Sequence, residues 1–406
     1  MSGSADAELP ATVVTAAALP AEPKFKPDPL PPDPDDVVLS IGGQRWQTWQ
    51  AVRVTRGVER MPADFDLTVT ENFPDPAQLG IRPAAPCKVQ ILGDLVLTGY
   101  VDRYAPAFDK SNHSVSFTGR SKCADLVDSA AIFEDANGQE IASQLQAVSA
   151  LELARKIAGP FGISVTAPDG PGPVIPQHNA LLTETGYEII ERVARFSQLL
   201  LYDDVDGNLV LAQAGKKRHA SGIAEGVNAE AGRVIFAWDQ RFTQYDVLLM
   251  QMNTLGDTTV TAEGNAGWNL RARLKDDTAA SGRHDGKPRR RRRVIVVEQQ
   301  WGGEDLALKR ARWELARRFG RSQAVQVTTD SWRDSAGVLW EPNWLVPLNL
   351  PHLKIVGEDW LLMEVTYRRD NTGTHADLTL MPPEAVQPQP ILLQPFNAQM
   401  YEALDK

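Results

Sequence analysis

The residues that could support metal or cofactor chemistry are few and scattered in this chain of 406 residues. Its six histidines form no His-x-x-x-His pair and have no flanking cysteine or carboxylate at the spacing of metal ligands. They are His113, His178, His219, His284, His352 and His375. The two cysteines, Cys87 and Cys123, are too few for a multi-cysteine zinc or iron–sulfur site, and we expect buried thiols. We therefore predict no metal site and no cofactor.

An acidic segment, Asp203-Asp204-Val205-Asp206-Gly207, has some of the character of a calcium-binding loop. With Gly207 at the sixth loop position, Tyr202 would be first and Gln213 twelfth, where carboxylates are needed. A turn between two strands fits the segment better, because Asp-Gly favours tight turns.

Signatures of catalysis are also missing from the sequence. It contains no Gly-x-Gly-x-x-Gly, no phosphate loop and no Gly-x-Ser-x-Gly elbow. A glycosidase pair of carboxylates stays open as an alternative, because such residues meet in space and not in sequence. We name no catalytic residue and expect no enzyme.

A local concentration of positive charge is formed by Arg289, Arg290, Arg291, Arg292 and Arg293. Guanidinium groups could bind phosphate there. The formal net charge of -10 argues against a general nucleic-acid binder, whose phosphate contacts need clustered cations. We therefore favour an exposed loop or an electrostatic contact with an acidic neighbouring subunit.

Two distant segments share one strand-turn-strand pattern. Residues 88–101 and 353–365 each have an apolar run, then Gly-Asp or Gly-Glu, then a second apolar run, which predicts a β-hairpin. Val101 follows Gly93, and Val365 follows Gly357, at the same spacing. One hairpin is too small to be stable alone, so we predict that each centres a β-rich domain and that the chain carries this domain twice. Chance likeness of two ordinary hairpins is the alternative.

Capping boxes at Ser149 and Thr185 predict two helices in a small α+β unit. Leu308, Ala311, Leu315 and Phe319 share one face of a later helix, which we expect to lie against the sheet of the second hairpin. No apolar run approaches the roughly 18 residues that cross a bilayer. Residues 1–20 contain no Lys or Arg, so a secretory signal is not expected, and we predict synthesis in the cytoplasm without membrane insertion.

Composition and periodicity divide the chain into six segments. They are an extended Pro-rich N-terminal arm (1–36), a first β domain (37–127), a small α+β domain (128–215), a second β domain (216–253 with 294–383), a polar, basic inserted segment (254–293) and an extended C-terminal arm (384–406). The arms have too few apolar side chains for a core, so we expect them to dock on neighbouring subunits or other proteins.

The order of several motifs resembles a known family. Residues 37–127 are similar to the N-terminal region of the baseplate hub protein of Mu-like contractile-tailed phages, the tail protein P family. The motifs are Ile41-Gly42-Gly43, residues 49–54, Ala63-Asp64-Phe65, residues 89–100 and Thr118-Gly119-Arg120-Ser121. Residues 187–211, 294–319 and 344–380 match later parts of the same pattern.

The resemblance implies an α+β fold that is mainly β, with two tube-like β-barrel or sandwich domains, a helix and smaller inserted α+β domains. It implies a homotrimer whose six tube-like domains form a ring between the hexameric tail tube protein and the trimeric central spike protein. Such a hub lies in the virion's tail baseplate beside other baseplate proteins, and DNA passes its lumen without sequence-specific binding. The alternatives are a tail-tip cell-wall hydrolase and a hub of a related injection machine, such as a phage-like particle or a type VI secretion system.

Overall fold

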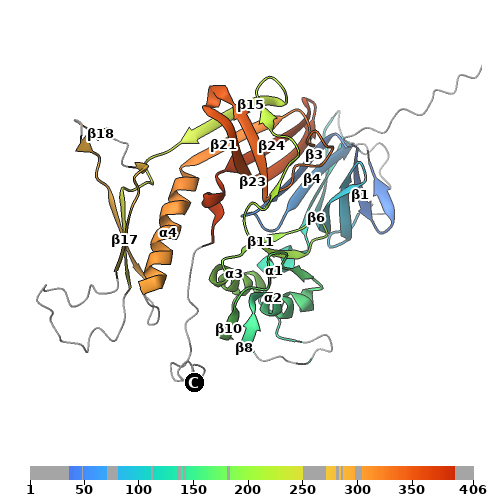
Figure 1. The fold of residues 1–406 in the computed structure, drawn as a ribbon. Coiled ribbons are helices and arrows are strands. Elements are labelled where there is room, and N and C mark those ends of the chain that lie inside the picture. The colour runs from blue at the N-terminus through green and yellow to red at the C-terminus, as the bar shows by residue number, and fades with distance from the viewer. Residues whose placement is uncertain are drawn as a thin grey trace, which may run out of the picture. The chain divides into compact units, whose positions relative to one another are not determined.

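A fourteen-stranded sheet contains most of the strands in the described part of the chain (Figure 1). The computed structural model describes residues 36–47, 49–70, 81–110, 113–134, 139, 143–180, 183–249, 271–279, 283–284, 287–297 and 304–388. The predicted N-terminal arm apart from Asp36, and the predicted C-terminal arm beyond residue 388, lie outside the described residues. The chain is mainly β with few helices, so the predicted fold class is confirmed.

The sheet contains strands from both predicted β domains. Its order is β15-β21-β24-β23-β3-β4-β7-β6-β5-β1-β2, and β22 pairs with β23, β13 and β14. The strands are β1 (Val37–Ile41), β2 (Gln44–Trp46), β3 (Ala51–Gly57), β4 (Asp64–Thr70), β5 (Pro86–Ile91), β6 (Asp94–Phe108), β7 (His113–Ser121), β13 (Lys217–Arg218), β14 (Ile223–Ala224), β15 (Ala229–Phe236), β21 (Gln323–Thr329), β22 (Trp344–Leu350), β23 (Ile355–Asp370) and β24 (Gly373–Met381). One core runs along it and includes Phe65, Phe117, Trp332, Trp340 and Tyr367.

The first predicted hairpin has its turn at Gly93. Ile91 pairs with Asp94, and the two residues between them, Leu92 and Gly93, have φ angles of 48° and 88°. Two successive left-handed residues are the requirement of the tightest hairpin turn. A Gly-Asp step between apolar runs therefore predicts this turn well.

The second hairpin reverses three residues earlier than expected. The 3-10 turn η4 (Pro351–Leu353), followed by Lys354 with a φ of 65°, joins β22 to β23. Gly357, with a φ of 68°, is the extra residue of a β-bulge in β23, because Val356 and Glu358 face consecutive residues of β22. The predicted turn at Gly357 is therefore wrong. A bulge and a tight turn both favour glycine at positive φ, so the local pattern does not distinguish them.

The small α+β unit has its own core. Its helices are α1 (Ala124–Asp128), α2 (Ala150–Ala158) and α3 (Gly186–Phe196), with the 3-10 turn η1 (Gly159–Phe161). Its strands are β8 (Gln144–Ser149), β9 (Val165–Thr166), β10 (Val174–Asn179), β11 (Leu200–Asp203) and β12 (Leu209–Ala212). Both capping boxes form, at Ser149 and at Thr185, so the two predicted helix starts are confirmed. The predicted turn at Asp206-Gly207 also forms, between β11 and β12.

A separate three-stranded sheet lies beside helix α4 (Glu304–Arg321), and its order is β17 (Arg271–Lys275), β16 (Gln244–Leu249), β20 (Arg292–Val297). Ala307 and Ala311 of α4 pack on Val247 and Ala272 of this sheet. The expected packing of the helix on the sheet of the second hairpin is therefore wrong. β16 and β20, which fall in the predicted second β domain, pair in this separate sheet. Apolar spacing predicts that a helix has a buried face, but not which sheet covers that face.

The remaining elements are β18 (Arg283–His284), β19 (Lys287–Pro288) and the 3-10 turn η5 (Pro383–Val386).

Candidate functional site

Two sets of five strands have the same topology within the large sheet. We call β3, β4, β5, β6 and β7 the first β set, and β15, β21, β22, β23 and β24 the second β set. The spatial order is β3-β4-β7-β6-β5 in the first and β15-β21-β24-β23-β22 in the second. In both sets the strands therefore lie in the order first, second, fifth, fourth, third along the chain.

Matching β-bulges align the two sets residue by residue. The longest strand of each set has two extra residues, Val96 and Asp102 in β6 and Gly357 and Met363 in β23, with the same spacing between them. Bulges are specific local features, so this match argues against chance. Val101 then corresponds to Leu362, and Gly93 to Lys354. The predicted alignment of Gly93 with Gly357 and of Val101 with Val365 is off by three residues.

The two sets are joined edge to edge. β3 pairs antiparallel with the second half of β23, from Gly57 opposite Glu364 to Val52 opposite Arg369. Across this junction the hydroxyls of Thr55 and Thr366 lie 3.1 Å apart. Figure 1 shows β23 and β24 running beside β3 and β4 without a break in the sheet.

A buried ion pair also crosses the junction. The Arg56 guanidinium donates to the Glu341 carboxylate at 2.8 Å, and the Arg56 side chain is 7% exposed. Burial lowers the pKa of Arg56 and the Glu341 charge raises it, with a net upward shift. The hydroxyl of Tyr367, whose pKa is raised by burial, donates to the Trp340 carbonyl on the same side. Since 285 residues separate Arg56 from Glu341, sequence reasoning had no signal for this pair.

Asp203 connects the small α+β unit to the first β set. Its buried carboxylate accepts hydrogen bonds from the Ala63 N–H, at 2.9 Å, and from the Ser121 hydroxyl. Burial raises the pKa of Asp203, although both hydrogen bonds oppose that shift. The acidic segment considered as a calcium loop therefore holds two parts of the fold together.

We expect the stability that Asp203 contributes to be present at low pH and lost as pH rises. The protonated form is favoured in the folded state, so the loss begins near the unfolded pKa of about 4 and ends above the raised folded value. Asp203→Asn, which resembles the protonated acid, should lack this slope in urea unfolding measured across pH. Asp206→Asn, at an exposed position, is the matched control. Equal pH slopes in wild type and Asp203→Asn would contradict this account.

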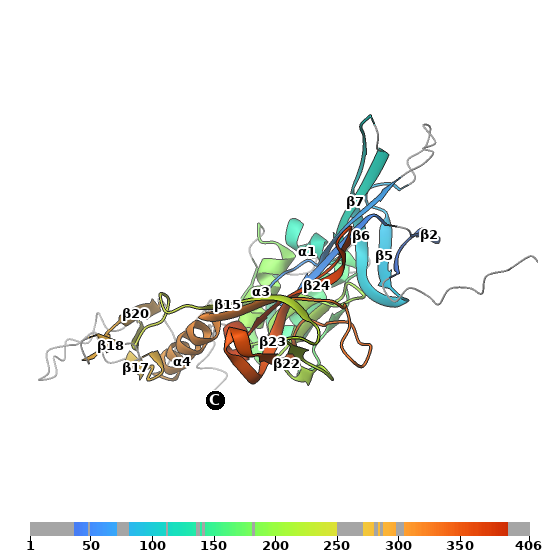
Figure 2. The ribbon, with the colours of Figure 1, turned by 90° about the horizontal axis from the view of Figure 1, so that it is seen from above.

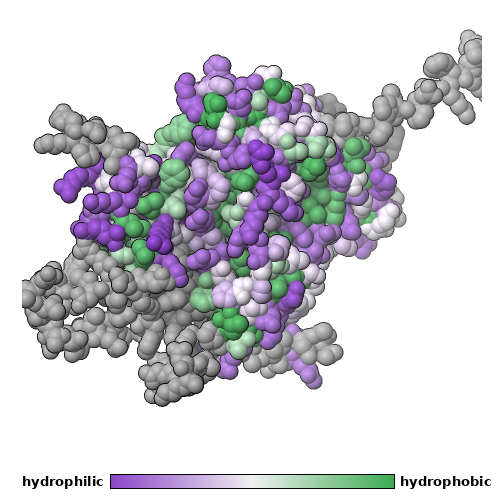
Figure 3. All heavy atoms as spheres, viewed as in Figure 1, coloured by the Kyte–Doolittle hydropathy of each residue, from purple (hydrophilic) through white to green (hydrophobic). Residues whose placement is uncertain are grey.

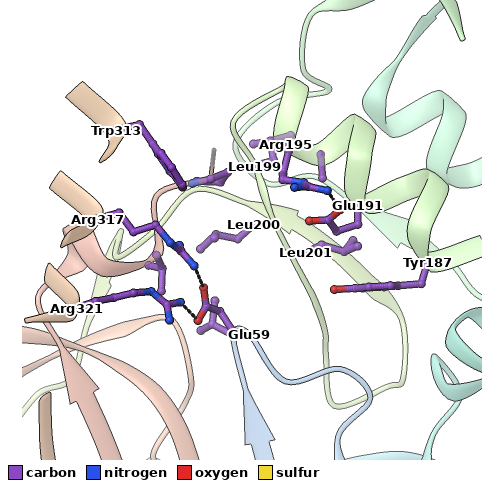
Figure 4. A pocket seen from close by; sticks show the side chains of 14 residues that line it. Glu59, Tyr187, Glu191, Arg195, Leu199, Leu200, Leu201, Trp313, Arg317 and Arg321 are labelled. Atoms are coloured by element: carbon purple, nitrogen blue, oxygen red, sulfur yellow. Dashed lines mark hydrogen bonds and ion pairs between the residues drawn. The ribbon is translucent and has the colours of Figure 1, made fainter. Parts of the chain in front are cut away.

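A recess of about 510 Å³ lies between α3, the end of β3 and α4 (Figure 4). Glu59 is paired with Arg317, at 3.3 Å, and with Arg321, while Glu191 is paired with Arg195 at 2.6 Å. A glycosidase needs a carboxyl of raised pKa facing its cleft. The described carboxyls with a raised pKa are Asp125 and Asp203, and neither lines this recess. The geometry is that of a joint held by ion pairs.

Four residues of the arginine run have contacts within the chain, and one of them is Arg289, whose guanidinium lies 4.6 Å from the centre of the Trp238 ring. Arg292 pairs with Asp246, whose buried carboxylate also contacts Arg273 at 2.7 Å. Arg293 pairs with Glu314 at 2.8 Å, and Arg291 lies 5.1 Å from the centre of the Trp238 ring. Arg290 is exposed. These internal contacts account for much of the run, and a contact of Arg290 with a neighbouring subunit stays a prediction.

Arg292→Ala should destabilise the protein, whereas Arg290→Ala should not. Without Arg292 the buried Asp246 carboxylate loses one of its arginine partners. We therefore expect the free energy of unfolding to fall by about 1–2 kcal/mol, a range that already allows for the solvent exposure of Arg292. The exposed Arg290 should change the free energy of unfolding by less than about 0.5 kcal/mol. Urea unfolding of the two variants would decide this, and equal midpoints would refute the internal role of Arg292.

The other candidate ligands do not gather. The buried His219 ring lies between Trp340 and Trp344, and its Nδ1 atom is 3.1 Å from the Asp334 carboxylate. Among the described residues, no group of three or more His, Cys, Asp or Glu side chains is arranged to hold a metal ion. Cys87 and Cys123 are free, buried thiols, as expected. In the described part of the chain, no helix is both long and apolar enough to cross a membrane.

Comparison with known proteins matches three parts of the chain to phage tail families. Residues 36–121 match the N-terminal domain of Mu phage GpP-like baseplate assembly proteins. Residues 123–213 match the second domain of gp44-like baseplate hub proteins, and residues 304–389 match the fourth domain of GpP. The three matches follow the order of the chain.

Relatives match over most of the chain. It is 26% identical over 353 residues to the baseplate hub protein gp44 of Escherichia phage Mu, covering 86% of this chain and 88% of that protein. The 43 kDa tail protein of prophage MuSo2 from Shewanella oneidensis is 30% identical, with a TM-score of 0.71, over 87% of this chain and 99% of that one. A tail protein from Neisseria meningitidis MC58 shares the fold, with a TM-score of 0.67 and 19% identity over 87% of this chain and 98% of that one.

The fold and these matches define a structural protein of phage tails. The chain belongs to the family of baseplate hub proteins of Mu-like phages, so the family predicted from its motifs is confirmed. A hub of this kind is a component of the virion.

Proposed function

We propose that three copies of this chain form a ring that joins the hexameric tail tube to the trimeric central spike. The observation that carries the proposal is the repeat of strand order and bulge positions in the two β sets. Three chains then supply six like units, which suit a hexameric tube on one face of the ring. The opposite face needs only three-fold symmetry, which suits a trimeric spike.

The proposed function is carried by interfaces and includes no catalysis. Its partners are the tail tube protein, the central spike protein and other baseplate proteins. DNA passes through the lumen without sequence-specific contacts, in keeping with the net charge of -10. A cell-wall hydrolase has weaker support, because the carboxylates of the recess are each paired with arginine.

Electron microscopy of the isolated protein tests this proposal. Face-on class averages should show an inner ring of six similar lobes, with a periphery that repeats three times. The periphery is three-fold because the α+β unit and the sheet covered by α4 each occur once per chain. An inner ring with three lobes, or an open filament, would contradict the proposal.

A further inference from the structure

The junction between the two β sets leaves two equivalent edges without a strand partner. Inside the chain, β3 pairs with residues 364–369 of β23. By the bulge alignment, residues 103–108 of β6 correspond to residues 364–369, and β15 corresponds to β3. Among the described residues, β15 ends the sheet, and residues 105–108 pair only with β7.

The correspondence of β15 with β3 rests on strand register and on sequence. Arg53 lies opposite Asp66, which lies opposite Thr118; Arg233 lies opposite Gln326, which lies opposite Thr379. Thr118 and Thr379 both follow the second bulge of their set. The local sequences are also alike, with Ala51-Val52-Arg53-Val54 in β3 and Ala231-Gly232-Arg233-Val234 in β15.

We propose that β15 of one copy pairs antiparallel with the second half of β6 in the next copy. This inference rests on the proposed ring and names the contact that closes it. Transferring the register of β3 on β23 gives the residue pairs at this contact. They are Ile235 with Ala105, Val234 with Pro106, Arg233 with Ala107 and Gly232 with Phe108.

The side chains at the two edges suit each other. Phe108 is 87% exposed, and Ile235 and Phe236 are 50% and 55% exposed. Exposed apolar side chains on an unpaired edge strand favour pairing with another chain. In the proposed register the Phe108 ring meets Gly232, which has no side chain to displace it, and Ile235 meets the small Ala105. In Figure 2 the adjoining ends of β6 and β7 project from the rest of the sheet, where a neighbouring copy can reach them.

Apolar side chains elsewhere do not single out another docking face in the view of Figure 3. There, hydrophobic and hydrophilic residues are interspersed over the described surface.

Backbone pairing at a sheet edge joins two copies strongly, because it adds hydrogen bonds that side-chain contacts alone do not supply.

Alternate residues of β15 direct their backbone N–H and carbonyl groups toward the proposed partner. The Ala237 N–H donates to the Ser322 carbonyl at 2.7 Å, on the β21 side, so alternate residues Ile235 and Arg233 also bond toward β21. Val234 therefore points its N–H and carbonyl toward the open edge. On the other strand, Pro106 has no N–H, so the contact has one hydrogen bond fewer than its intramolecular counterpart. A proline at an edge also limits pairing with wrong partners.

Cross-linking at one residue pair tests the register. Ala105 and Ile235 correspond to Thr366 and Thr55, which form a non-hydrogen-bonded pair of the antiparallel ladder. The Cα atoms of such a pair lie about 4.5 Å apart, which is within the range that a disulfide can span. Ala105→Cys with Ile235→Cys should give disulfide-linked trimers under mild oxidation. Ala105→Cys with Val234→Cys, whose thiols fall on opposite faces, should not. The native Cys87 and Cys123 are buried and should stay unreacted.

The outcomes separate this inference from the proposed function. If wild type has the mass of three chains but the matched pair links no better than the control pair, the strand pairing is overturned and the trimer stands. If wild type has another mass but the matched pair links selectively, the trimer is overturned and the strand pairing stands. A second pair, Ala107→Cys with Arg233→Cys, gives the same readout if the first variant folds poorly, as judged by circular dichroism.

Discussion

Replacing Glu341 with Gln should lower the free energy of unfolding by about 3 kcal/mol. The change leaves the Arg56 guanidinium in the junction between the β sets without its counter-charge, and its side chain is only 7% exposed. Removing one partner of a buried ion pair typically costs about 3–5 kcal/mol, and we take the low end because Glu341 is 25% exposed. Urea unfolding, read as a shift of the midpoint at unchanged slope, measures the effect.

An exposed acid provides the control. Asp359 pairs with Arg218 at 2.9 Å, and both side chains are well exposed, so Asp359→Asn should cost less than about 1 kcal/mol. The double change Arg56→Met with Glu341→Leu should recover much of the stability lost in Glu341→Gln, because no charge is then left buried. Equal midpoints for Glu341→Gln and Asp359→Asn would show that the ion pair does not stabilise the junction.

Val234→Pro should convert the assembled protein into a folded monomer. The Val234 N–H points away from β21, so the isolated sheet loses no ladder hydrogen bond, and proline is tolerated at such an edge. In the proposed ring the proline removes a donor and places its ring against the next copy. Sedimentation should show a monomer at concentrations where wild type is a trimer, with a circular dichroism spectrum like that of wild type.

Val234→Ala is the matched control, because it keeps the N–H and removes only side-chain packing. It should remain a trimer. If Val234→Pro also remains a trimer with unchanged affinity, β15 is not the edge that joins the copies.

Local sequence signals predicted the elements whose requirements are local. The capping boxes at Ser149 and Thr185 satisfy backbone groups within one turn, so they mark helix starts whatever lies around them. Glycine at position 93 predicts a turn because the tightest hairpin turn needs positive φ angles at its two central residues, here Leu92 and Gly93. Gly357 misled the prediction because a bulge needs the same φ, while the true turn uses Lys354, which carries no glycine signal.

Contacts between residues far apart in the chain could not be predicted from the sequence. The apolar face of α4 was visible in the spacing of its residues, but its partner sheet includes Val247 and Ala272, which precede it by many residues. The junction depends on Arg56 meeting Glu341 and on β3 meeting β23, and neither contact has a local signature. The family resemblance gave the hub class, and the structure supplied the edges through which such a hub could assemble.

The mass of the native protein in solution, alone and with its spike, tests the central claim most directly. We predict three times the mass of the 44.6 kDa chain for the protein alone, and one spike trimer added to three chains for the complex. A stable monomer or dimer would contradict the proposed ring of three chains. So would a ring of six chains, because six copies would supply twelve of the repeated β sets where the proposed ring uses six.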